Sequence, residues 1–146
     1  MKLIALTFLT FAAIAAAQTP ADWQVMKDKK QLCQISVPAG WTADKIMPSS
    51  LTAPDKKTSL IFSNKPASAT YDQIAKGAKD MFKPTKTFEE TGKRTWFVST
   101  PGPGAKGTTW YAVVSTSPIC EVELKFQDPA FEPNAKLIVN SLKLTK

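Results

Sequence analysis

The sequence contains no histidine, only two cysteines and a single arginine among its 19 basic residues. Without an imidazole, the chain has no serine–histidine or cysteine–histidine nucleophile, no histidine acid–base catalyst and no histidine metal ligand. Beyond its first 17 residues it also lacks a hydrophobic run of the roughly 20 residues that a membrane-spanning helix needs. The remaining chemistry therefore depends on carboxylates, lysines, hydroxyls and aromatic rings.

The first 17 residues have the layout of a secretory signal peptide, with a bacterial-looking leader. Lys2 precedes an apolar run from Leu3 to Ile14, and the alanines at 15–17 form a small-residue cleavage site. The run is too short for a membrane anchor, and no cysteine lies near the cleavage site for lipid attachment. We therefore expect an exported protein, periplasmic or extracellular, whose mature chain (residues 18–146) forms a single domain.

The chain is basic, with a net charge of +7. Lysine is a hydrated point charge, whereas base recognition favours the planar fork of arginine, so an exported lysine-rich protein is not expected to bind nucleic acid. The charge could serve solubility or attract anionic envelope polymers or lipid headgroups. Lys76, Lys79, Lys83 and Lys86 are the candidates for such an anionic-surface contact. The alternative is that they form an ordinary solvated face.

Hydrophobic alternation and turn residues predict two hairpins followed, after a helix, by a four-stranded meander. The predicted strands cover residues 23–27, 31–37, 50–53, 57–63, 85–90, 94–100, 108–116 and 119–126. The prolines fall almost entirely between these segments, as strand and helix interiors require. This order predicts an α+β fold, an antiparallel sheet flanked by helices in an α/β/α sandwich.

Two segments have helical rather than strand periodicity. The first, at residues 68–82, places Ile74, Ala78, Met81 and Phe82 on one stripe, and Thr70 with Gln73 forms a capping box at its start. The second follows residue 131, and its expected buried side chains are Ala135, Leu137, Ile138 and Leu142. Residues 141–144 are expected to straighten into a short strand.

Cys33 and Cys120 are predicted to form a disulfide. Two cysteines in an oxidising compartment are normally paired. Strand parity places Cys33 on the same face as Ile35 and Val37, and Cys120 on the same face as Val122, so both thiols face the core. Two separate buried thiols are the alternative. A catalytic cysteine is least expected, because it would need a basic partner such as histidine.

Other candidate sites are weaker. Residues 100–109 are glycine-rich, but they lack the order of a phosphate-binding loop and lead into a strand, so they are interpreted as a hairpin connection. Glu121 and Glu123 share the outer face of a strand, and a calcium site with Asp128 would lack a dedicated loop. Trp96, Trp110 and Tyr111 are expected mainly in the core, and an apolar cleft between sheet and helix is the expected place for a small ligand.

Two motifs resemble those of PsbP-like and Mog1-like domains. The segment Ile35-Ser-Val-Pro-Ala-Gly-Trp41 is similar to their opening, and Ala135-Lys-Leu-Ile-Val-Asn-Ser-Leu-Lys143 is similar to their closing helix and strand. The resemblance implies an antiparallel sheet between helices. It also implies a non-catalytic accessory or binding role, because the family includes photosystem accessory subunits and a regulator of a small GTPase. The histidine metal contacts of plant members have no counterpart here, so no metal or other cofactor is expected.

The sequence thus predicts a small exported binding or accessory protein, not an enzyme, whose partner is an envelope or secreted protein or polymer. One alternative is a carboxylate-dependent hydrolase with an aromatic cleft, which would need two facing acids. The other is a lysine-rich module that binds anionic envelope polymers or lipids.

Overall fold

The computed structural model describes residues 19–90, 93–100 and 106–145. The predicted signal peptide, residues 1–17, lies outside the described residues, as does the centre of the glycine-rich connection, residues 101–105. Within the described part of the chain, no helix has the length and apolar character needed to cross a membrane. In chain order the elements are β1 (Gln24–Lys27), β2 (Cys33–Val37), β3 (Thr42–Ala43), β4 (Ser50–Thr52), β5 (Ser59–Asn64), α1 (Tyr71–Phe82), β6 (Lys86–Glu90), β7 (Arg94–Ser99), β8 (Thr108–Val114), β9 (Cys120–Phe126), the short 3₁₀ helix η1 (Pro129–Phe131), α2 (Glu132–Ser141) and β10 (Lys143–Leu144).

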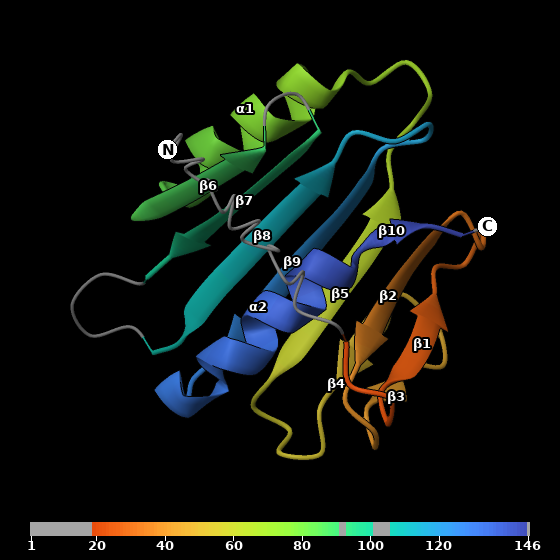
Figure 1. The fold of residues 1–146 in the computed structure, drawn as a ribbon, viewed down its shortest axis with the longest axis vertical. Coiled ribbons are helices and arrows are strands. Elements are labelled where there is room, and N and C mark those ends of the chain that lie inside the picture. The colour runs from red at the N-terminus through yellow and green to blue at the C-terminus, as the bar shows by residue number, and fades with distance from the viewer. Residues whose placement is uncertain (1–18, 91–92, 101–105, 146) are drawn as a thin grey trace, which may run out of the picture.

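The described strands form two antiparallel sheets (Figure 1). The larger has the order β3-β4-β5-β9-β8-β7-β6, so the predicted meander supplies one half of it and the predicted second hairpin lies beside β9. The smaller has the order β1-β2-β10, because the predicted first hairpin pairs with the C-terminal strand instead of joining the main sheet. In this pairing Leu144 lies opposite Cys33.

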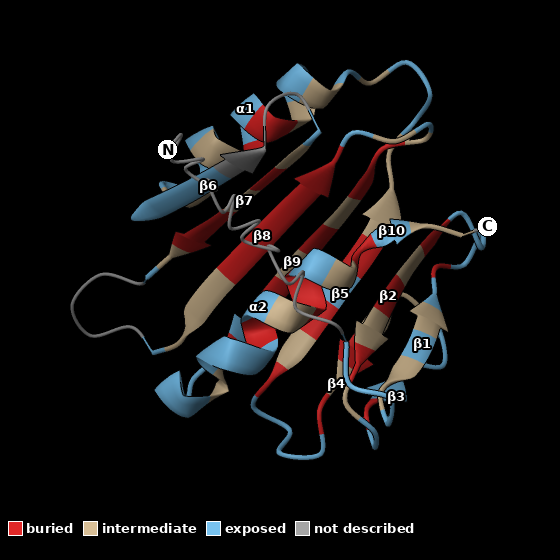
Figure 2. Cartoon of the chain, in the orientation of Figure 1, coloured by how far each residue is buried: buried red, intermediate tan, exposed pale blue. Residues whose placement is uncertain are grey.

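The two helices cover opposite faces of the large sheet. Neighbouring residues of β8 point to opposite sides of the sheet, so they pack under different helices. Tyr111 and Val113 pack with Phe97 in the cluster under α1. Trp110 and Ala112 belong to the main core, which also includes the buried side of α2 and the inner face of β2. Figure 2 shows that β8 is buried along most of its length, while β9 alternates between buried and less buried residues. The predicted α+β fold with an antiparallel sheet flanked by helices is confirmed.

Helix α1 begins where the sequence predicts. The hydroxyl of Thr70 accepts a hydrogen bond from the Gln73 amide at 3.3 Å, and the Gln73 side chain accepts one from the Thr70 amide at 3.2 Å. This reciprocal capping box satisfies two of the free donors of the first turn. The helix ends at Lys83, which has a left-handed backbone (φ 48°) immediately before Pro84.

One residue of the predicted α1 stripe was placed wrongly. Ala78 is buried, but Met81 is 75% exposed. The packed face is centred on Ala75 and Ala78, and at about 100° per residue Met81 falls on the flank of that face. An apolar spacing therefore located the helix correctly, whereas the sheet beneath it determined which flank stayed open.

Helix α2 is buried on more than one side because it lies against both β2 and β8. Ala135, Ile138 and Leu142 are fully buried, as predicted, and Leu137 is half-buried. Val139, which the spacing did not single out, is also fully buried. A helix held between two sheets has a wider apolar stripe than one that covers a single sheet.

The predicted disulfide is present in the structure. Cys33 of β2 and Cys120 of β9 are joined at an S–S distance of 2.03 Å with their Cα atoms 5.9 Å apart. Neither cysteine is exposed. The bond therefore connects the small sheet to the large one inside the core.

Arg94, the single arginine, holds the C-terminal end of α2 to the large sheet. Its Nη1 donates to the backbone carbonyl of Val139 and its Nη2 to that of Leu142, both at 2.9 Å. The last carbonyls of a helix have no partner within the helix, and a cation placed there also complements the helix dipole. Arg94 thus satisfies two backbone acceptors that lie next to fully buried side chains.

Candidate functional site

Two clefts on opposite faces of the large sheet combine polar and apolar side chains. The first, the α1 cleft, has a volume of about 330 Å³ and lies between α1 and strand β9. Its lining residues are Lys65, Ile74, Gly77, Ala78, Met81, Phe82, Tyr111, Glu121 and Glu123. The helix supplies the apolar wall, and the sheet supplies the polar floor.

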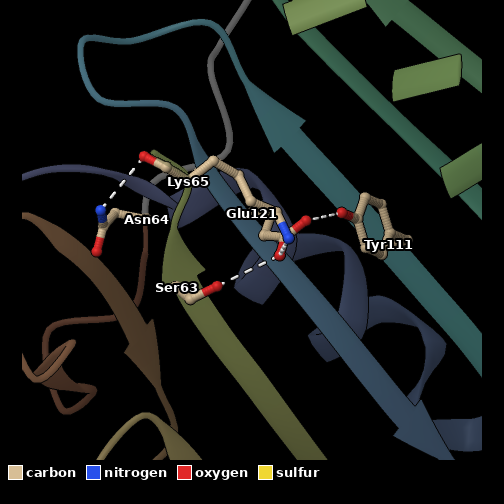
Figure 3. Close-up of polar contacts among 5 residues, drawn as sticks. All are labelled: Ser63, Asn64, Lys65, Tyr111 and Glu121. Carbon is tan, nitrogen blue, oxygen red and sulfur yellow. Dashed lines mark hydrogen bonds and ion pairs between the residues drawn. The ribbon is translucent and has the colours of Figure 1, made fainter. Parts of the chain in front are cut away.

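Glu121 is the centre of that polar floor (Figure 3). Its Oε1 forms an ion pair with Lys65 and accepts a hydrogen bond from the Ser63 hydroxyl at 3.3 Å. Its Oε2 accepts a hydrogen bond from the Tyr111 hydroxyl. Ser63 lies directly opposite Glu121 on β5, and Tyr111 lies diagonally across on β8. The sheet register therefore brings three partners to one carboxylate.

The electrostatics of this group favour a fixed structure over proton transfer. Burial, followed by the negative charge of Glu121 and the hydrogen bond to it, raises the pKa of Tyr111 well above its ordinary value of 10.0. The phenol therefore stays protonated at neutral pH and donates. Glu123 is paired with Lys125 at 2.8 Å. Both carboxylates of the α1 cleft thus have cationic partners, and ion pairs and hydrogen bonds hold the polar side chains of the floor to one another.

The sequence interpretation of Glu121 and Glu123 as a simple outer row was incomplete. The side chain of Glu121 is only 15% exposed, because α1 covers part of the face that alternation marked as outer. No sequence pattern identified Ser63 and Lys65 as partners of Glu121, because they lie at the end of a strand that is far from Glu121 in sequence. Within the described residues, no group of three acidic or sulfur-bearing side chains could hold a metal ion.

The second cleft, the aromatic cleft, lies between the large sheet and the start of α2, where the sequence places a small-molecule site. Its volume is about 240 Å³. Its described lining residues are Thr85, Lys86, Phe88, Trp96, Val98, Thr100, Thr108, Trp110, Phe126, Pro129, Glu132 and Lys136.

A stack of three rings forms the floor of the aromatic cleft. Phe88 and Trp96 are nearly parallel, with ring centroids 3.8 Å apart, and Trp96 and Trp110 are stacked at 5.0 Å. The series continues through tilted contacts from Trp110 to Phe126 at 6.4 Å and from Phe126 to Phe131 at 5.5 Å. The stack runs from the edge strand β6 to the middle of the sheet.

Exposure changes steeply along this stack. Phe88 is 41% exposed, whereas Trp110 is 3% exposed. The expectation that the tryptophans serve the core is therefore confirmed for Trp110 and for the neighbouring Tyr111, while Trp96 is only partly buried. The sequence analysis did not single out Phe88, although the charged residues two positions before and after it in β6, Lys86 and Glu90, indicate a strand position that is not fully buried.

The rim of the aromatic cleft is charged. Lys86 and Lys136 lie on it, and Glu132 is its one acidic side chain among the described lining residues. A glycosidase-type hydrolase needs two carboxyl groups facing each other across the substrate. The described lining of this cleft supplies one.

The four predicted lysines do not form one surface. Lys76 lies on α1 and is paired with Asp80 at 2.6 Å, one turn away. Lys79 lies in the last turn of α1, and Lys83 is its C-terminal cap. Lys86 lies two residues before Phe88 on the same face of β6, and it lines the aromatic cleft on the other face of the sheet. An anionic-surface contact through all four remains a prediction from sequence.

Comparison with known proteins concerns the fold. No family model matches the chain, and no curated protein matches its sequence. The structure is similar to the solution structure of cyanobacterial PsbP (CyanoP) from Synechocystis sp. PCC 6803, with a TM-score of 0.52 and 13% sequence identity. The similarity covers 91% of this chain and 98% of that chain. The resemblance drawn from the two sequence motifs is therefore confirmed as a fold: the chain adopts a PsbP-like α+β fold.

Proposed function

We propose that the protein is an exported, non-catalytic accessory protein that binds one sugar ring of an envelope or secreted polysaccharide in the aromatic cleft. The observation that carries this proposal is the ring stack that begins at the exposed face of Phe88 and continues through Trp96 into the cleft. The PsbP-like fold supports a binding role only as an analogy, since folds host many functions.

The size of the cleft favours one ring of a larger partner. Its 240 Å³ is below the roughly 300–1,000 Å³ of pockets that enclose a whole small molecule. A polymer could place one ring in the cleft while the rest of the polymer stays outside it. The partner would therefore be anchored by one ring and positioned by the rim.

The rim favours a sugar over an aromatic side chain. The apolar face of a pyranose can lie on the ring stack, while its hydroxyls accept from Lys86 and Lys136 and donate to Glu132. A phenylalanine ring would cover the same aromatic surface and leave these polar groups without partners, which costs binding energy.

Titration with soluble oligosaccharides, followed by the indole N–H signals in NMR, tests the proposal. Phe88→Ala should weaken binding by up to about tenfold, because ring stacking contributes roughly 0.5–1.5 kcal/mol. The matched control is Ile61→Ala, an equally exposed apolar side chain (49%) on β5, which should leave the affinity unchanged. Equal loss in both variants, or indole shifts with aromatic peptides and none with oligosaccharides, would contradict the sugar assignment.

A further inference from the structure

We propose that a third hollow, at the end of the large sheet away from the disulfide, binds a small phosphate or sulfate ester. This lysine hollow has a volume of about 450 Å³. Its lining residues are Lys57, Ser59, Ser99, Lys106, Gly107, Thr108, Thr109, Lys125, Phe126 and Gln127. It shares Thr108 and Phe126 with the aromatic cleft at this end of the sheet, but its lysines do not line that cleft, and this proposal stands apart from the sugar proposal.

A continuous polar row forms the floor of the lysine hollow. Ser59 lies opposite Lys125, Lys125 lies opposite Thr109, and Thr109 lies opposite Ser99 in the sheet register. Directly opposed residues of antiparallel strands share a face and lie within reach of one another. Four adjacent strands thus place an ammonium group and three hydroxyls side by side on the face that α1 covers only in part.

The charged side chains among the described lining residues are all lysines. Lys57 follows the turn before β5, Lys106 precedes β8, and Lys125 lies on β9, so three segments deliver three cations. None of the described lining residues is acidic. Glu123 is paired with Lys125 and offsets one charge. The hollow therefore retains an excess of positive charge over a floor of hydroxyl donors.

Asp55 is the acidic residue nearest to Lys57 in sequence, and its carboxylate is hydrogen-bonded within the turn. Asp55 accepts hydrogen bonds from the amides of Lys57 and Thr58 at 2.8 Å and from the Thr58 hydroxyl at 2.7 Å. These bonds lower the pKa of Asp55 and keep its carboxylate in the turn. The charge of Lys57 also lowers the pKa of Asp55, so this carboxylate offsets part of the charge of Lys57.

The available donors match an oxyanion. The Ser99 hydroxyl donates to the carbonyl of Phe82 at 2.6 Å and is committed to the end of α1. Within the described residues, the hydroxyls of Ser59 and Thr109 have no protein partner, so they can donate to a ligand. Lysine ammonium groups attract phosphate or sulfate as point charges and impose no planar geometry.

The glycine-rich connection contributes to this hollow through its described end. Gly107 has a φ of +102°, and a Cβ there would lie 3.1 Å from the backbone oxygen of Phe126. Only glycine therefore lets the chain approach the end of β9 this closely, and this approach brings Lys106 to the hollow. The segment is a hairpin connection, as predicted, and it also delivers a cation.

The volume distinguishes an ester from a bare ion. A cavity of 450 Å³ is far larger than one tetrahedral oxyanion. The anionic group would occupy the lysine and hydroxyl floor, and an organic part would fill the rest. The same chemistry is carried by a free phosphate ester and by a phospholipid headgroup.

The test uses the folded mature protein and inorganic pyrophosphate at low salt, followed by calorimetry and amide NMR shifts. The variant Lys57→Gln/Lys106→Gln should bind at least tenfold more weakly, since a hydrogen bond to a charged group is worth about tenfold in affinity or more. The control Lys29→Gln/Lys45→Gln makes the same charge change at exposed positions elsewhere and should stay within twofold. Thr109→Val tests the hydroxyl floor and should weaken binding severalfold.

Vesicles containing phosphatidylglycerol form the second arm. Vesicle binding that pyrophosphate displaces, and that the Lys57→Gln/Lys106→Gln variant loses, identifies a lipid headgroup as the source of the phosphate. Vesicle binding without any pyrophosphate binding would overturn the proposal, because a flat charged contact needs no hollow. Equal weakening in the control pair, or no pyrophosphate binding by folded protein, would overturn it as well.

Discussion

Arg94 allows a quantitative test of how α2 is attached to the sheet. Its guanidinium donates to two carbonyls at the end of the helix, those of Val139 and Leu142. The side chains of both residues are fully buried. In Arg94→Ala these carbonyls lose their donors, and the end of the helix loses the cation that complements its dipole.

The magnitude follows from the two bonds. A hydrogen bond from a charged donor contributes roughly 1.5–3 kcal/mol. Arg94 is only half-buried, so the lower end applies, and two bonds give a loss of about 3 kcal/mol in the free energy of unfolding. For a domain of this size that corresponds to a fall in Tm of about 10 °C. Arg94→Lys keeps the charge but can reach one carbonyl, so about half of this loss is expected.

Urea unfolding, followed by tryptophan fluorescence and far-UV circular dichroism, measures the change. Lys93→Ala is the control, because it removes the same charge from the exposed neighbouring position. A loss of less than about 0.5 kcal/mol in Arg94→Ala relative to this control would refute the reasoning, since even one unpaired buried acceptor costs about 1–3 kcal/mol. An equal loss in the lysine variant would show that the planar fork, and not the charge, holds the helix.

Three further predictions concern stability. Reduction of the Cys33–Cys120 bond should lower the free energy of unfolding by up to about 4–5 kcal/mol, given the sequence separation of 87; denaturation with and without reductant measures this, and two alkylatable thiols in unreduced, denatured protein would contradict the bond. The raised pKa of Tyr111 contributes stability that is fully present below about pH 10 and is lost as the pH rises further; Tyr111→Phe should flatten that alkaline decline in pH-dependent melting, and an unchanged slope would argue against the raised pKa. Gly107→Ala should destabilise the fold by about 1–3 kcal/mol because of its positive φ, whereas Gly77→Ala, in a helix with nothing within 4 Å of the added Cβ, should stabilise it by about 0.5–1 kcal/mol; chemical denaturation of both checks the opposite signs.

The features that could be predicted from sequence are those set by local periodicity. The alternation around Cys33 and Cys120 placed both thiols on the core side, and the structure joins them. The capping box at Thr70 and the stop at Pro84 fixed the ends of α1 because both depend on neighbouring residues only. The fold class followed from the order of these segments.

The candidate sites depend on contacts that local patterns do not contain. Alternation gave the two faces of β9, but it could not show that α1 covers the face bearing Glu121. Lys65 reaches this carboxylate from a distant segment, and only the strand order brings them together. Local patterns likewise could not show that the register of β6 places Lys86 beside the aromatic cleft, on the other face from α1. An anionic-surface contact through the four lysines stays a prediction.

The pairing of β10 with β2 also has a kinetic consequence. Leu144 lies opposite Cys33, more than 100 residues earlier in the sequence, so the small sheet cannot be completed until the chain between them has been synthesised. Contacts so distant in sequence slow folding, because the intervening chain must be closed first. Until then one edge of β2 stays unpaired and can pair with other chains. A truncation just after α2 would make that transient aggregation hazard permanent.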